Sequence, residues 1–266
     1  MAPAQTSSHA AWRALHQSAC APYRQAGRFA WHWARGKLGR DPVFRGMLQR
    51  GDLPAQARVV DIGCGQGLVA SLLHACAQLQ QQGQWPAEWP VRAGARAYTG
   101  IELMASDVQR GQAALASLPR LEGAAFVPEL RCADMRQALL PRCDVVVILD
   151  VLHYVDHAAQ AELLQRVRSA LLPDGLGRSV QANPQHPQPG RLLLRVGDAA
   201  STRGFAVSQW VDRVVTGVRG HRVPPTWGRT LVQWQGLLQE LGFVVRSVPQ
   251  SQGTPFANVL LIADLP

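Results

Sequence analysis

The sequence predicts an α/β protein in which helices cover a mainly parallel sheet. From residue 58 onward, short β-branched runs alternate with stretches of helical length that are rich in Ala, Leu and Gln. A glycine-rich turn follows the first of these runs, and acidic residues follow several of the others. The chain has 266 residues, of which 47% are hydrophobic, so it can form the core of one large domain.

The N-terminal part of the chain predicts helices of a different composition. Apolar residues recur at helical spacing over residues 9–20, and an aromatic segment follows from Phe29 to Trp33. Asp41-Pro42 has the form of an N-cap followed by proline at the first helical position. We therefore expect residues 1–50 to form a basic, aromatic-rich helical cap and residues 51–266 to form the main domain.

The remaining elements of the main domain are predicted from hydrophobic patterning and from the glycines and prolines that end helices and strands. Strands are expected at 58–62, 97–101, 125–127, 144–149, 191–196, 243–248 and 258–263. Helices are expected at 67–80, 105–117, 157–171 and 231–241, the last ending at Gly242 as a C-cap glycine. Residues 80–96 and 173–190 are rich in Gln, Gly and Pro, and they predict exposed loops without a function of their own.

Composition also excludes several classes of protein. No apolar run approaches the ~18 residues of a membrane span, and arginines at 13, 24 and 28 interrupt the N-terminus where a secretory signal would need an apolar stretch. The five cysteines are odd in number and lack CxxC or CxxH spacing. The sequence therefore predicts a cytoplasmic protein with reduced, mostly buried thiols and no metal site.

The positive charge is concentrated in two segments. The chain has 27 Lys and Arg against 18 Asp and Glu, for a net charge of +9. Residues 1–50 contain eight basic residues and one acidic residue, and residues 199–230 contain five and one. Such segments favour an anionic partner: an acidic carrier protein, a phosphorylated or carboxylated substrate, nucleic acid or anionic lipid.

The most informative stretch runs from Val59 to Ala70. Asp61 lies near the end of a strand, and three glycines at positions 63, 65 and 67 then lead into a helix. This arrangement brings backbone amides and a helix N-terminus against a ligand. A dinucleotide fingerprint would place glycine or alanine where Leu68 stands, which disfavours a hydride-transfer dehydrogenase.

Acidic residues follow the next predicted strands. Glu102 ends the second strand, where a carboxylate can accept hydrogen bonds from both hydroxyls of a ribose. Asp134 and Met135 follow the third strand and suit an adenine, the carboxylate for its amino group and the thioether for its ring. Asp150 ends the fourth strand. Each of these carboxylates alone could equally be a helix N-cap.

The motifs VVDIGCGQG, GIEL, CADM, ILDVLHYVD and LLPDG, followed later by GRLLLRVGD, resemble those of the class I S-adenosylmethionine-dependent methyltransferases. The resemblance covers residues 55–263. It implies a Rossmann-like sheet of seven strands that ends in a reversed β-hairpin, and S-adenosyl-L-methionine as the cofactor. The residues that it implies for cofactor binding are Asp61, Gly63, Gly65 and Gly67 at the methionine portion, Glu102 at the ribose, Asp134 and Met135 at the adenine, and Asp150 near the methionine end. Cys64 and Leu103, which lie within the motifs, belong to the same set.

A general base is needed only if the methyl acceptor must lose a proton, as a phenol must. His153 follows Asp150 by three residues and is the best-placed candidate, with Tyr154 beside it. His221, which lies among arginines, is a second candidate, and Asp198 is a third unless it caps the next turn. A packed histidine without a chemical role is an equal alternative at position 153.

The class of methyl acceptor is restricted mainly by the motifs that the sequence lacks. Residues 150–153 read Asp-Val-Leu-His, where amino-methylating enzymes of nucleic-acid bases have an N-P-P-Y type of motif, and no Pro-Cys nucleophile for cytosine methylation is present there. Small organic acceptors fit better. RNA or protein methylation, and a cofactor-binding protein without enzymatic activity, remain as alternatives.

A narrower similarity concerns ILDVLHYVDH, RLLLRVGD and GTPFANVLL, which look like segments of methyltransferase-like proteins encoded with bacterial polyketide or aryl polyene pathways. It implies a role in secondary metabolism and an acceptor that is aromatic or bound to an acidic acyl carrier protein. We expect residues 1–50 and 199–230 to form a basic rim around the acceptor, with an apolar wall from Trp31, Trp33, Phe205 and Trp210.

Overall fold

The computed structural model describes residues 7–90, 92–121, 126–171, 190–200, 226–250 and 258–266. Within these residues, seven strands form a mainly parallel sheet, as predicted, and their order in the sheet is β3-β2-β1-β4-β5-β7-β6. Contacts divide the chain into two compact units, residues 1–145 and 146–266. No helix in the described ranges is long and apolar enough to span a membrane.

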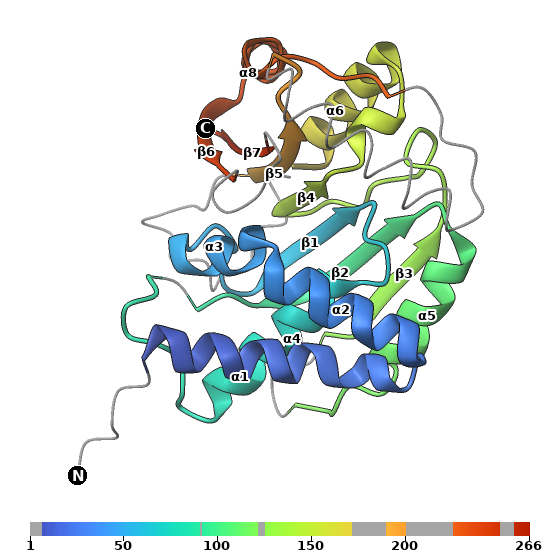
Figure 1. The fold of residues 1–266 in the computed structure, drawn as a ribbon. Coiled ribbons are helices and arrows are strands. Elements are labelled where there is room, and N and C mark those ends of the chain that lie inside the picture. The colour runs from blue at the N-terminus through green and yellow to red at the C-terminus, as the bar shows by residue number, and fades with distance from the viewer. Residues whose placement is uncertain (1–6, 91, 122–125, 172–189, 201–225, 251–257) are drawn as a thin grey trace. The chain divides into compact units, whose positions relative to one another are not determined.

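The first unit contains three parallel strands and five α-helices within its described residues (Figure 1). The strands are β1 (Ala57–Ile62), β2 (Ala95–Glu102) and β3 (Pro128–Cys132). The helices are α1 (Ser8–Cys20), α2 (Arg28–Arg40), α3 (Pro42–Arg50), α4 (Leu68–Gln81) and α5 (Ala105–Leu115), with a 3₁₀ turn, η1 (Ala21–Arg24), between the first two.

The N-terminal helices form part of the core of this unit. The helix α1 packs on α4 and buries Ala11, Leu15 and Ala19, while η1 packs against α5. Asp41 caps α3, its Oδ1 accepting a hydrogen bond from the Val43 amide at 3.1 Å, which confirms the predicted helix start. The periodic apolar face of residues 9–20 therefore covers a neighbouring helix, as its spacing indicates.

Two predictions for this unit were wrong. The third strand does not lie at 125–127 but at Pro128–Cys132. It is an edge strand in which only Leu130 is buried, so a prediction based on a run of apolar residues placed it wrongly. The segment 80–96 is not simply an exposed loop. Trp89 is buried, contacts the Trp85 ring edge-on with centroids 5.2 Å apart, and donates from Nε1 to Ser8 Oγ at 2.9 Å.

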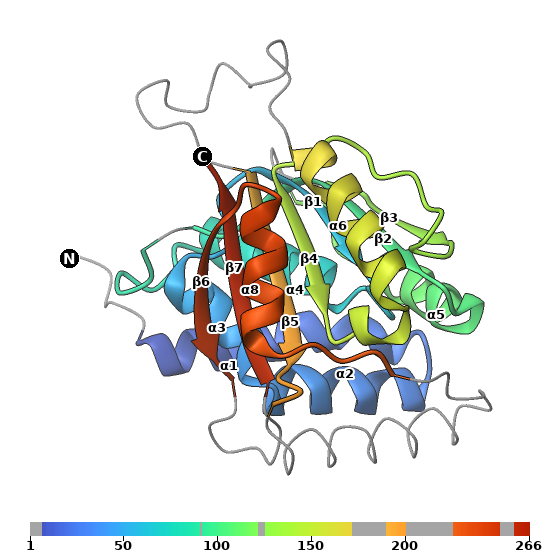
Figure 2. The same ribbon diagram turned by 90° about the horizontal axis from the view of Figure 1, so that it is seen from above.

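The second unit contains β5, β6 and β7 with the helices α6 and α8, and β4 begins at its boundary. The bounds are β4 (Val145–Leu149), α6 (His157–Leu171), β5 (Gly190–Gly197), α8 (Leu231–Glu240), β6 (Val244–Pro249) and β7 (Asn258–Leu265), with a 3₁₀ turn, η2 (Leu152–Tyr154). The strand β7 is antiparallel to both β5 and β6, which gives the reversed hairpin that was expected, and α8 lies on β6 and β7 (Figure 2).

Candidate functional site

The glycine turn after β1 has the backbone conformation that only glycine adopts readily. Gly63, Gly65 and Gly67 have φ angles of 72°, 55° and 75°, in the left-handed region. A Cβ added to Gly65 would meet nothing within 4 Å, whereas one added to Gly67 would lie 2.9 Å from Leu115. The turn therefore presents open space at Gly65 and packs closely against α5 at Gly67.

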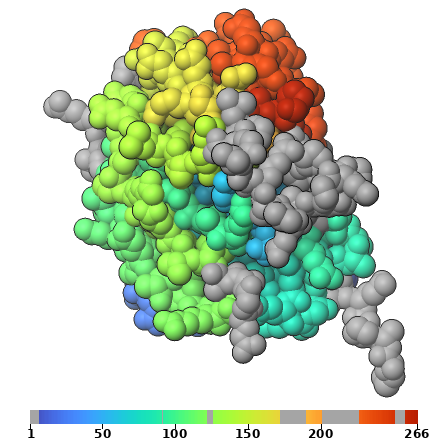
Figure 3. Space-filling model, turned by 180° about the vertical axis from the view of Figure 1, so that it is seen from behind, coloured from blue at the N-terminus to red at the C-terminus, as the bar shows by residue number. Residues whose placement is uncertain are grey.

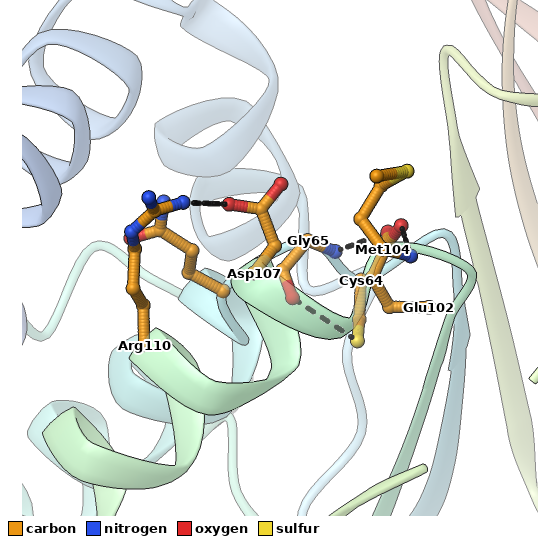
Figure 4. A network of polar contacts seen from close by, with 7 residues as sticks. Cys64, Gly65, Glu102, Met104, Asp107 and Arg110 are labelled. Atoms are coloured by element: carbon orange, nitrogen blue, oxygen red, sulfur yellow. Dashed lines mark hydrogen bonds and ion pairs between the residues drawn. The ribbon is translucent and has the colours of Figure 1, made fainter. Parts of the chain in front are cut away.

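The carboxylate of Glu102 lies beside this turn, at the end of β2. Its Oε2 accepts a hydrogen bond from the Gly65 amide at 3.0 Å, and its Oε1 accepts one from the Met104 amide at 2.8 Å (Figure 4). Each carboxylate oxygen has a further lone pair for a ligand hydroxyl. Open space at Gly65 and an adjacent, fixed carboxylate fit the adenosyl group of the cofactor that the sequence implies.

The two residues that flank these groups differ in exposure. Cys64 is buried, and a Cβ added to Gly100 would lie 2.7 Å from its sulfur, so the thiol packs onto β2. Burial raises the pKa of this thiol well above its ordinary value, and the thiol stays protonated. Leu103 is 61% exposed at the end of β2. The backbone of Cys64 therefore forms part of the glycine turn, whereas its side chain packs against β2.

The side chain of Asp61 is buried in the first unit. Its Oδ2 accepts a hydrogen bond from the Tyr98 hydroxyl at 2.6 Å, and only 3% of the residue is exposed. Burial raises its pKa to about 7; the Tyr98 hydrogen bond opposes this, and the charge of Glu102 adds to it. This carboxylate therefore joins β1 to β2.

Asp134 and Met135 follow β3 next to the end of β2. The Ala133 amide donates to the Glu102 carbonyl oxygen at 2.9 Å, so the two segments meet at one edge of the sheet. Arg136 forms a bidentate ion pair with Asp134, with Nη2 at 2.6 Å from Oδ2, and its backbone amide also bonds that carboxylate. Both predicted adenine residues are half-buried. In Figure 3, which views the molecule from behind, surface atoms of α5 and of residues 126–145 are visible in green to yellow-green.

In the second unit, Asp150 is fixed by Arg195 of β5. The Arg195 Nε donates to Asp150 Oδ1 at 2.7 Å, and its Nη2 bonds Oδ2. Arg195 is only 2% exposed, and the Asp150 amide donates to the Arg195 carbonyl oxygen at 3.2 Å. Asp150 has a φ of 59°, a conformation that few side chains favour. The strand end therefore carries an oriented carboxylate.

The predicted base lies in η2. The rings of His153 and Tyr154 are half-buried with centroids 4.2 Å apart. The Trp227 amide donates to the His153 carbonyl oxygen at 2.8 Å. Gln160, fully buried in α6, donates to carbonyl oxygens of Leu152 and Trp227 at 3.2 and 2.8 Å, so it ties η2 to residue 227.

Other predicted groups are placed differently. Asp198 caps a turn, because its Oδ1 accepts from the amides of Ala200 and Leu231 at 3.0 and 3.1 Å. His221, Phe205 and Trp210 lie outside the described residues. No group of three or more His, Cys, Asp or Glu side chains that could hold a metal ion occurs among the residues that were described.

Some buried polar residues have no signal in the sequence that singles them out. Tyr23, Gln66 and Gln160 are fully or almost fully buried, and their polar atoms bond to backbone carbonyls or carboxylates far away in the chain. The sequence around a tyrosine or a glutamine predicts none of these contacts. Among residues 1–50, which were expected to form a basic cap, Arg24 of η1 and Arg35 of α2 stack over Trp31, with guanidinium carbons 5.3 and 4.8 Å from the ring centroid.

Comparison with known proteins gives the family. Residues 30–248 match the family model described as a methyltransferase domain. No curated protein matches the chain by sequence.

Solved structures of methyltransferases share the fold. Magnesium protoporphyrin IX methyltransferase from Synechocystis PCC 6803, crystallised with SAH, is 20% identical, with 92% of this chain and 93% of that chain covered and a TM-score of 0.54. An O-methyltransferase family protein from Burkholderia thailandensis is 17% identical, with 91% and 61% covered and a TM-score of 0.54.

Human N-acetylserotonin methyltransferase is 15% identical, with 98% of this chain and 60% of that chain covered and a TM-score of 0.51. The chain thus spans about three fifths of the length of the Burkholderia and human structures. Because the family model covers most of the sequence and the sheet order is as described, the chain belongs to the methyltransferase domain family and is a class I S-adenosylmethionine-dependent methyltransferase.

Proposed function

We propose that this enzyme transfers the methyl group of S-adenosylmethionine to a small organic acceptor. The observation that carries the proposal is the Glu102 carboxylate, fixed by the Gly65 and Met104 amides beside the open side of the glycine turn. Two structural neighbours are named for magnesium protoporphyrin IX and N-acetylserotonin, both small molecules, which supports an acceptor of this class.

The first unit supplies the groups that would hold the cofactor. Glu102 would accept the ribose hydroxyls, the amides of the glycine turn would face the methionine portion, and Asp134 with Met135 would contact the adenine. When bound, the cofactor supplies an electrophilic methyl group on a sulfonium. The transfer is an in-line displacement, so the protein contributes mainly by aligning the acceptor and excluding water.

We propose His153 as the group that takes a proton when the acceptor is a hydroxyl. The hydrogen bond from the Trp227 amide fixes the backbone of His153, and the adjacent Tyr154 ring restricts the imidazole. Imidazole is the side chain that most often serves as a general base in proton transfer. Tyr154 and His221 are the further candidates.

An anionic acceptor, or one carried by an acidic acyl carrier protein, is supported by the basic residues of η1 and α2. Residues 1–40 contain no Asp or Glu. Arg24 of η1 and Arg35 of α2, both exposed, stack over the ring of Trp31, and a stacked guanidinium keeps its planar edge available for carboxylate or phosphate. Nucleic acid would meet the same groups, so RNA methylation is the competing assignment.

The proposal is tested with the purified protein in two steps. Calorimetry with S-adenosylmethionine should show saturable binding. Incubation with a panel of phenols, carboxylic acids and acyl carrier protein conjugates should then give a product heavier by one methylene group in mass spectrometry. The alternative predicts methylated oligonucleotides instead, with binding that falls steeply as salt is raised. Cofactor binding with no methylated product from any class would support a binding protein.

A further inference from the structure

The N-terminal segment reaches the glycine turn through one side chain. Tyr23 belongs to η1, and none of its surface is exposed. Its hydroxyl donates a hydrogen bond to the carbonyl oxygen of Gln66 at 2.9 Å, across 43 residues of sequence. Both residues lie in the first unit. Burial raises the pKa of the Tyr23 hydroxyl well above 10, so it remains a donor at physiological pH.

The peptide between Gln66 and Gly67 is thereby held on both sides. Tyr23 binds its carbonyl oxygen, while its N–H donates to the Cys64 carbonyl oxygen at 2.9 Å. From α5, Gly111 comes so close that a Cβ added there would lie 2.8 Å from the same Gln66 oxygen. The carbonyl is enclosed between η1 and α5.

The side chain of Gln66 adds a second anchor. It is 1% exposed, and its Nε2 donates to Asp107 Oδ1 at 3.1 Å. Asp107 also pairs with Arg110 at 3.2 Å, and this ion pair is drawn beside the Gly65–Glu102 contact in Figure 4. Gln66 is thus tied to η1 through its backbone and to α5 through its side chain.

A turn with glycine at three positions needs such restraint. Glycine loses more conformational freedom on ordering than any other residue, and a ligand that must order a loop loses affinity accordingly. The Gln66–Gly67 peptide lies between Gly65, whose amide bonds Glu102, and the start of α4. Fixing this peptide sets the direction of the amides on both sides of it.

We propose that Tyr23 is a positioning residue for the cofactor: its hydroxyl fixes the Gln66–Gly67 peptide and so preorganises the glycine turn for S-adenosylmethionine. The inference rests on the proposed function, because it assigns the turn to that cofactor. Tyr23 acts through the backbone of Gln66. The N-terminal segment would then serve cofactor binding as well as the acceptor.

The test is Tyr23→Phe, which removes the hydroxyl and keeps the ring that fills the core. The matched control is Ser18→Ala, because Ser18 Oγ donates to Gln78 Oε1 at 2.5 Å and links α1 to the far end of α4 without reaching the turn. Calorimetry below the unfolding temperature of both variants should show S-adenosylmethionine binding about fivefold weaker for Tyr23→Phe, as for the loss of one hydrogen bond, and unchanged for Ser18→Ala.

Hydrogen exchange gives a readout that needs no ligand. In Tyr23→Phe the amide of Gly67 should exchange faster, while amides in the middle of α4 keep their protection. Equal affinity for the cofactor in Tyr23→Phe and the wild type, or equal losses in both variants, would overturn the inference. Wild-type protein that fails to bind S-adenosylmethionine would instead refute the proposed function.

Discussion

The backbone amide of Gly65 donates a hydrogen bond to Oε2 of Glu102 over 3.0 Å. This contact joins the turn after β1 to the end of β2 and aims a carboxylate at the space in front of the glycine. Because both residues are fixed by the backbone of parallel neighbouring strands, paired from Ala57–Ala95 to Ile62–Ile101, the geometry is built into the sheet.

The buried carboxylate of Asp61 makes stability depend on pH. Its pKa is about 7 in the folded protein against an ordinary value of 3.8, chiefly because of burial. Between these values the unfolded chain has released the proton and the folded chain has kept it, so the free energy of unfolding falls as pH rises from about 4 to about 7. Asp61→Asn should remove this part of the decline, as measured by urea unfolding across that range.

Asp144 serves as a control for the pH experiment. Its side chain pairs with Arg58 at 2.8 Å, and the hydrogen bonds from Arg58 hold its pKa below the ordinary value despite the opposing effect of burial. The ionised Asp144 therefore adds to the free energy of unfolding above pH about 4, and this stabilisation is lost as pH falls further. The dependence on pH is opposite in sign to that of Asp61. Parallel pH profiles for the wild type and Asp61→Asn between about 4 and about 7 would contradict the assignment.

Glycine 111 marks the closest approach of α5 to the glycine turn. A Cβ there would lie 2.5 Å from Leu130 and 2.8 Å from the Gln66 carbonyl oxygen. Gly111→Ala should lower the free energy of unfolding by about 1–3 kcal/mol through overpacking. Gly36→Ala is the matched control in α2, where a Cβ meets nothing within 4 Å, and it should raise that energy by about 0.5–1 kcal/mol. Similar thermal unfolding of the two variants would refute the packing argument.

The ion pair between Arg195 and Asp150 supports the end of β4. Arg195 is 2% exposed, so Arg195→Met should cost about 2 kcal/mol or more by leaving the carboxylate without this cation. The double variant with Asp150→Asn, which tolerates a positive φ, should recover part of the loss in a double-mutant cycle. Arg131→Met, which breaks an exposed pair with Glu129, should change stability by about 0.5 kcal/mol at most. Equal costs at positions 195 and 131 would contradict this ranking.

The sequence predicts most elements of this fold because their signals are local. The N-cap at Asp41, the C-cap glycine at 242 and the buried run of β4 each depend on adjacent residues, and the structure confirms all three. The strand β3 was misplaced by three residues at its start. As an edge strand with the sequence Pro-Glu-Leu-Arg-Cys it buries only Leu130, so it lacks the apolar pattern that identifies central strands.

In the candidate site, too, residues with a local signal in the sequence could be predicted, and contacts between distant residues could not. Glu102 and the glycines are found from spacing, since strand ends of a parallel sheet meet at one edge. The partners of Asp61 and Asp134, namely Tyr98 and Arg136, alter the surroundings of these carboxylates in ways that spacing does not reveal. Tyr23 could not be found, because its hydrogen bond to the turn depends on how η1 packs against α5.

The most direct measurement is the affinity of Glu102→Ala for S-adenosylmethionine, determined by calorimetry beside Glu129→Ala. Glu129 lies on β3, where both of its carboxylate oxygens accept hydrogen bonds from Arg131, so it controls for the loss of an acidic side chain from this sheet. Charge-assisted hydrogen bonds to a ribose predict binding weaker by about tenfold to a hundredfold in Glu102→Ala. Unchanged affinity in Glu102→Ala, with both variants folded, would contradict the account.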